Sequence, residues 1–202
     1  MNKLLEFLNL RPDKNQRWIL GSLFISGLLS TYISPAITKA IITELPAEWI
    51  AFESLFSSIV GLIIGIIWKG GFRREIIRWF IYFCICECLA GCLLGLYLCF
   101  VQYNVWVFAI TTLIYSNFIA TLVGKCIMAF RSVLWIEKER EIYDNNLSIV
   151  SGIVCMIGFG LALLVMPSLK VALFIWALGC IFDDIGWIIV YIQNKEKLKR
   201  VD

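Results

Sequence analysis

The chain contains no histidine and little charge. Its 202 residues include 18 Lys and Arg, 15 Asp and Glu and no His, so charged residues make up only 16% of the sequence. Without an imidazole we expect no His general base, no Cys–His protease, no haem ligation and no His-containing zinc site. We therefore predict that the protein is not an enzyme and uses no cofactor and no metal.

Hydrophobic residues replace the missing charge and make up 60% of the chain. A soluble domain is nearer half apolar and a quarter charged. About 20 apolar residues cross a bilayer as a helix, so this length holds about six spans and leaves no room for a soluble domain. We expect no cleavable signal peptide before the first span, and we expect that span to act as the insertion signal.

Six apolar stretches predict an all-α integral membrane protein with six transmembrane helices. The expected layout is a cytoplasmic segment (1–17), a six-helix bundle (18–192) and a basic cytoplasmic tail (193–202). The predicted spans are 18–41, 47–68, 76–100, 105–128, 147–166 and 171–192.

Lys and Arg fall in alternate connections between these stretches. Sixteen of the 18 lie in the N-terminal segment, around the second and fourth connections, and in the tail; Lys39 and Lys170 are the two exceptions. The positive-inside rule then predicts a multi-pass protein of the cytoplasmic (inner) membrane with both termini in the cytoplasm. The net charge of only +3 and the lack of a basic soluble face argue against nucleic acid as a partner.

Cysteines lie mostly inside the apolar stretches, where a free thiol behaves as a small hydrophobic group. In the run Cys84-Ile85-Cys86-Glu87-Cys88, helical geometry puts Cys84 and Cys88 on one face while Cys86 points away. We expect neither a disulfide nor a metal site there.

Small residues recur at four-residue spacing in several spans, which is typical of close helix packing in lipid. The first span carries a ladder of hydroxyls and the second a Ser and two Gly. The third carries three Cys with two Gly beside them, and the fifth a Ser, a Gly and a Cys with a Gly and an Ala nearby. An alternative for the first ladder is a polar wall along a transport path. The residues are Ser22, Ser26, Ser30, Ser34 and Thr38; Ser57, Gly61 and Gly65; Cys84, Cys88 and Cys92 with Gly91 and Gly95; and Ser148, Gly152 and Cys155 with Gly158 and Ala162.

Ionisable side chains inside the spans mark candidate sites. Glu87 falls near the middle of the third span and Asp183 and Asp184 fall in the sixth, where an ionised group usually faces the bundle interior or water. They are candidates for proton-coupled transport; the alternative is a fixed ion pair with Lys125. The candidates for the substrate or proton path are Glu87, Asn117, Asp183, Asp184, Lys125, Ser30, Ser34 and Trp187.

The second connection, which runs from Gly65 through Lys69 to Arg73 and Arg74, resembles the loop between helices two and three of the major facilitator superfamily, G-x-x-x-D-R-x-G-R-K. Lys69 stands where that family has Asp. The segment from Arg131 to Arg140 and the glycines of the fifth span resemble the corresponding parts of efflux members. The residues that match the gating loops are Gly65, Arg73, Arg74 and Arg140.

This resemblance spans the chain but covers one half of a twelve-helix transporter. It implies a bundle of two three-helix repeats of inverted topology. It also implies a homodimer, or another partner subunit, that moves a small amphipathic molecule or peptide by alternating access.

Two other functions stay open. A substrate-binding subunit of an energy-coupling-factor importer has a similar length and span number, although its family tends to carry an Ala-x-x-x-Ala docking face where this chain has Ser and Thr. A non-catalytic membrane protein that acts in assembly, immunity or defence is the third.

Overall fold

The computed structural model describes residues 13–67, 73–101 and 103–199. All regular structure in this part of the chain is helical. In chain order the elements are α2 (Lys14–Glu44), α3 (Glu48–Ile67), α4 (Arg73–Phe100), α5 (Val105–Ile114), the π-helix η1 (Tyr115–Ile119), α6 (Ala120–Leu134), α7 (Glu137–Leu164) and α8 (Leu169–Lys199).

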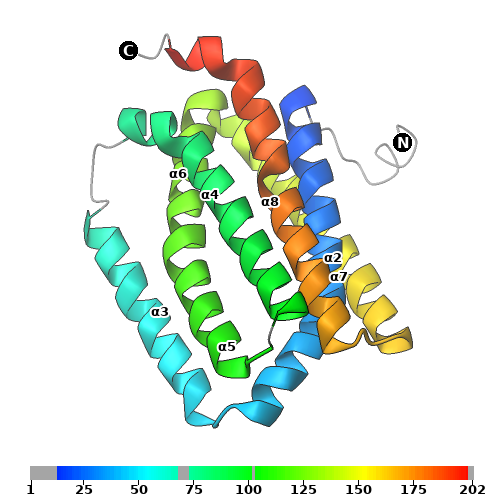
Figure 1. The fold of residues 1–202 in the computed structure, drawn as a ribbon. Coiled ribbons are helices and arrows are strands. Elements are labelled where there is room, and N and C mark those ends of the chain that lie inside the picture. The colour runs from blue at the N-terminus through cyan, green and yellow to red at the C-terminus, as the bar shows by residue number, and fades with distance from the viewer. Residues whose placement is uncertain (1–12, 68–72, 102, 200–202) are drawn as a thin grey trace.

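Among the described residues, six helices are long and apolar enough to cross a membrane, which confirms the predicted all-α fold with six long apolar helices. The fourth of them is built from α5, η1 and α6 in continuous succession. Because six spans reverse direction five times, α2 begins and α8 ends at the same end of the bundle (Figure 1). We name this the terminal end, and the opposite one the far end.

Several helices extend beyond the spans predicted for them. The fifth helix begins at Glu137, ten residues before the predicted start at 147, and the last helix continues to Lys199 beyond the predicted end at 192. At the start of α7, the backbone N–H of Ile136 donates to the Glu139 carboxylate at 3.1 Å, and acidic side chains stabilise a helix N-terminus. Hydropathy marks where an apolar run begins, and these helices extend past their apolar runs.

The helices pack as a fan in which α2 and α4 both contact α8 (Figure 1). The α7 helix packs against the other side of α2, and α6 packs against α4. The α3 helix contacts η1 of the fourth span and, at the far end, takes part in the buried cluster of Leu45, Trp49, Val105, Ala109 and Leu113. If the first, second and third spans are exchanged for the fourth, fifth and sixth, the same pairs of helices remain neighbours: the contact of α2 with α8 becomes that of α6 with α4, and the contact of α2 with α7 becomes that of η1 with α3.

Glycines allow the close helix crossings, as expected for the first, third and fifth spans. A Cβ at Gly186 of α8 would lie 2.7 Å from the Trp18 carbonyl oxygen and 2.8 Å from Ile19 Cα of α2. A Cβ at Gly95 of α4 would lie 2.8 Å from the Ala177 Cβ of α8, and Gly158 of α7 faces Thr31 of α2. The expected contacts at the glycines of α3 and at Gly152 of α7 are wrong for this chain, because no atom lies within 4 Å of a Cβ built at any of the three.

A cluster of aromatic side chains fills the terminal half of the bundle. Trp187 of α8 lies at its centre, 6.0 Å from the Tyr143 ring of α7 and 6.2 Å from the Trp135 ring that follows α6. Phe80 stacks on Phe130 with ring centroids 5.1 Å apart. We name this the aromatic cluster: Phe80, Phe130, Trp135, Tyr143, Trp187 and Tyr191.

Candidate functional site

A cavity of about 420 Å³ lies midway along the bundle, on the far side of the aromatic cluster. It is lined by the middle parts of α2, α7 and α8, with Glu87 of α4 and Tyr115 of η1 completing the wall. Among the lining residues Ser30, Ser151 and Asp183 are exposed. These three residues come from α2, α7 and α8, so the cavity opens on the side of the bundle where α2 lies between α7 and α8.

Two of the predicted intramembrane acids line this cavity. Asp183 accepts a hydrogen bond of 3.1 Å from the Ser26 hydroxyl, which ties α8 to α2. Glu87 has only 5% of its surface exposed and accepts a bond of 3.4 Å from the Tyr115 hydroxyl. The cavity is therefore acidic, and hydroxyl groups hold its carboxylates in place.

The third acid, Asp184, lies behind the wall of the cavity. Its side chain is 3% exposed and faces the Glu87 carboxyl group across the contact between α8 and α4. A carboxylate only accepts hydrogen bonds, so two facing carboxyl groups can bond to one another only when one of them holds a proton. Asp183 lies close enough to Glu87 to repel a negative charge there.

The π-helix brings Tyr115 to the cavity. A π-helical turn shifts the hydrogen-bond register and often marks a functional site. Asn117 Nδ2 donates to the Leu113 carbonyl oxygen at 2.8 Å, one turn back on its own span. Asn117, a predicted path residue, thus supports the irregular turn and is not part of the lining.

The remaining path candidates fall in three places. Ser30 lines the cavity, whereas Ser34, one turn further along α2, does not. Trp187 belongs to the aromatic cluster. Within the described residues, the ion pair considered for Lys125 and Asp184 does not form, so that interpretation is wrong: Asp184 turns toward Glu87 of α4.

The cysteines form no disulfide, since all eight are free. Cys84 and Cys88 face inward while Cys86 is exposed, as helical geometry predicts. The Cys88 thiol donates to the Cys180 carbonyl oxygen of α8 at 3.2 Å. Their role here is packing between α4 and α8.

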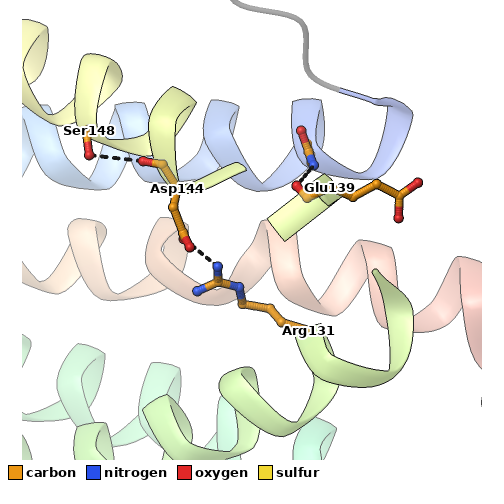
Figure 2. Close-up of polar contacts among 5 residues, drawn as sticks. Arg131, Glu139, Asp144 and Ser148 are labelled. Carbon is orange, nitrogen blue, oxygen red and sulfur yellow. Dashed lines mark hydrogen bonds and ion pairs between the residues drawn. The ribbon is translucent and has the colours of Figure 1, made fainter. Parts of the chain in front are cut away.

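A polar network closes the terminal end, next to the short turn between α6 and α7 (Figure 2). Arg131 of α6 forms an ion pair with Asp144 of α7, and its guanidinium lies 4.6 Å from the centre of the Tyr143 ring. Gln16 Nε2 of α2 donates to the Glu139 carbonyl oxygen at 3.0 Å. Together these contacts join three helices over the aromatic cluster.

The predicted gating residues lie near this end. Arg140 is half-buried in the first turn of α7. Gly65 lies in the last turn of α3 with open space around it. Arg73 and Arg74 begin α4, and the side chains of both, like all of Lys69, lie outside the described residues.

Several lining residues were not predicted as part of a site. Ser26 belongs to the predicted hydroxyl ladder, and Tyr115 and Ser151 were not predicted to line a site. A single sequence gives no signal for Tyr115, because the π-helix that turns it inward breaks the regular 3.6-residue periodicity. Ser151 has only its spacing to distinguish it from an ordinary packing residue.

Compared with known protein families, with curated proteins and with solved structures, the chain has no match. The resemblance to the major facilitator superfamily therefore stays a prediction that rests on the motifs alone.

Proposed function

We propose that the protein is a half-size membrane transporter subunit that acts as a homodimer in the cytoplasmic membrane. It moves a small amphipathic solute by alternating access, coupled to protons. The observation that carries this proposal is the cavity midway along the bundle, which has Glu87 and Asp183 in its wall and Asp184 behind Glu87.

The volume of the cavity and its position suit a transported solute. Sites for small molecules usually enclose about 300–1,000 Å³. Carboxyl groups inside membrane-spanning helices are costly and are typical of proton relays and substrate paths. A pair of facing carboxyl groups offers a group that takes up and releases protons as a solute leaves and enters.

The sideways opening of the cavity favours a second copy of the chain. Ser30, Ser151 and Asp183 are exposed on one side of a bundle whose surface there is otherwise apolar. Facing lipid, an ionised Asp183 would cost several kcal/mol, about 2.5–3.5 on insertion scales. A partner bundle over this opening removes that cost and encloses the solute path, and two-fold symmetry is the simplest way to supply one.

The arrangement of helices supports two inverted three-helix repeats. The main contacts join a span of the first three to a span of the last three, and each has a counterpart when the two sets are exchanged: the contact of α2 with α8 corresponds to that of α6 with α4. The third spans of the two repeats, α4 and α8, pack on one another at the centre. A repeat with three spans is inverted relative to the next, as in many secondary transporters. The acids of the site come from this central pair of helices.

In the proposed orientation the terminal end lies in the cytoplasm. The basic residues near this end, which include Arg131 and Arg140, favour it by the positive-inside rule. The network that joins α2, α6 and α7 then acts as the cytoplasmic gate. A green fluorescent protein fused at the C-terminus is expected to fluoresce, and an alkaline phosphatase fused there is expected to be inactive; active phosphatase would contradict this orientation.

Cross-linking tests the dimer. With the eight native cysteines replaced by alanine, Ser151→Cys at the opening is expected to give a disulfide-linked dimer on oxidation in membranes. Ser54→Cys, on the exposed face of α3, is the matched control and is expected to stay monomeric. Failure of Ser151→Cys and a neighbouring Ser30→Cys to cross-link, with a monomer by mass in mild detergent, would refute the homodimer.

A further inference from the structure

We infer that the cavity binds an organic cation with an aromatic or similarly flat apolar body. This inference rests on the proposed function, because it names the class of solute that the same site carries. It follows from three features of the cavity: its charge, its aromatic wall and its shape.

The charge of the cavity is negative. Glu87 and Asp183 line it, Asp184 faces Glu87 from behind the wall, and the three carboxyl groups come from two helices that pack together. No Lys or Arg is present among the described residues of the lining, so no side chain of the wall neutralises them.

The aromatic side chains beside the carboxylates suit an apolar cation. Trp176 and Tyr115 both line the cavity, with ring centroids 5.9 Å apart and planes at 75°. Phe108 supports Trp176 from behind at 6.1 Å. The faces of such rings attract cations, most strongly where water is excluded, so an aromatic wall and carboxylates select the same kind of ligand.

The shape of the cavity favours an organic ion over a bare metal ion. Its volume of about 420 Å³ exceeds what a coordinated metal fills, and apolar side chains such as Leu23, Val150 and Val154 form part of the lining. Within the described part of the chain, no three acidic or thiol side chains converge as metal ligands do. The hydroxyls of Ser26, Ser30 and Ser151 supply additional acceptors for a polar edge of the ligand.

The test measures equilibrium binding to the full-length protein in mild detergent with three aromatic probes of different charge. Ethidium is a planar cation, phenanthridine is its uncharged parent ring system and anilinonaphthalene sulfonate is an aromatic anion. We expect saturable binding of ethidium, at least tenfold tighter than that of the other two probes, a difference of about 1.4 kcal/mol or more.

Variants then separate charge from packing. Asp183→Asn is expected to weaken ethidium binding at least tenfold, while Asp183→Glu, which keeps the charge, retains most of it. Glu53→Gln on the exposed face of α3 is the matched control and leaves binding unchanged. If Asp183→Asn is not monodisperse after purification, Glu87→Gln takes its place.

Three results would overturn the inference: no saturable ethidium binding, binding of phenanthridine as tight as that of ethidium, or unchanged ethidium affinity in the folded neutral variant. These outcomes are distinct from failure of the proposed function. A protein that cross-links through Ser151→Cys but does not bind ethidium keeps the dimer and loses the cation site, and a monomer that binds ethidium does the reverse.

Discussion

The hydroxyl of Ser26 donates a hydrogen bond of 3.1 Å to Oδ1 of Asp183, and this bond joins α2 to the carboxylate that faces the cavity. It links packing to function, because the first and the last span meet at the same side chain that is proposed to hold the solute.

A double-mutant cycle of Ser26→Ala and Asp183→Ala is expected to give a coupling energy of about 0.5–1.5 kcal/mol in unfolding measurements, the range for a partly buried hydrogen bond. The matched cycle uses Ser22, whose hydroxyl donates to the Ile19 carbonyl oxygen of its own helix. Ser22→Ala is expected to show no coupling with Asp183→Ala. Equal coupling in both cycles would mean that the Ser26 bond is not specific.

The close crossing of α2 and α8 predicts a strong effect at Gly186. An Ala there places its Cβ against backbone atoms of Trp18 and Ile19, which cannot move aside as a side chain does. We expect a loss of about 1–3 kcal/mol in the free energy of unfolding. Gly152→Ala is the control, because nothing lies within 4 Å of its Cβ, and is expected to leave stability unchanged or slightly raised. Thermal unfolding in detergent compares the two, and equal stability would contradict the packing.

The network at the terminal end predicts unequal effects from its two charged partners. Asp144 is 59% exposed, so Asp144→Asn is expected to change the free energy of unfolding by less than about 1 kcal/mol. Arg131→Ala removes the same ion pair and also the guanidinium over the Tyr143 ring, so it is expected to cost more. Chemical denaturation measures both variants. A larger effect of Asp144→Asn would show that the ion pair, and not the ring contact, stabilises this end.

The facing carboxyl groups of Glu87 and Asp184 predict that cation binding releases protons. The other titratable groups near this pair carry no positive charge; they are Asp183, Tyr115, Cys84, Cys88 and Cys180. A bound cation favours the ionised form of the pair, so the ethidium affinity is expected to rise with pH. Calorimetry in two buffers of different ionisation enthalpy counts the protons; we expect about one per ethidium in the wild type and fewer in Glu87→Gln. Zero in the wild type would contradict proton coupling.

Much of this fold follows from the sequence, because apolar runs of about 20 residues are typical of membrane-spanning helices. Six apolar runs predict six helices, and predicted glycines such as Gly95 and Gly158 lie where helices approach closely. The glycines of α3 fit the same pattern, but a Cβ built at either one would contact no other helix of this chain. Four-residue spacing alone therefore does not predict which helix faces pack against another helix. Helix ends were missed because polar turns such as 137–146 continue helices beyond their apolar runs.

The site was predictable only in part. Intramembrane acids are costly, and this cost singled out Glu87, Asp183 and Asp184 without knowledge of the fold. The crossing of α4 with α8 decides which of these acids meet, and the sequence does not specify that crossing. For this reason the sequence did not predict that Asp184 faces Glu87 and not Lys125. Tyr115 enters the site through a local π-helix, a register change that hydrophobic periodicity does not report.

The proposed transport is tested most directly by ethidium uptake into proteoliposomes that contain trapped DNA, whose fluorescence reports ethidium reaching the interior. With an acidic interior as the driving force, the wild type and the Glu53→Gln control are expected to take up ethidium well above protein-free vesicles. Asp183→Asn, reconstituted to the same level, is expected to show no uptake beyond those vesicles. Uptake by Asp183→Asn equal to that of the wild type would contradict the assignment of this cavity as the transport site.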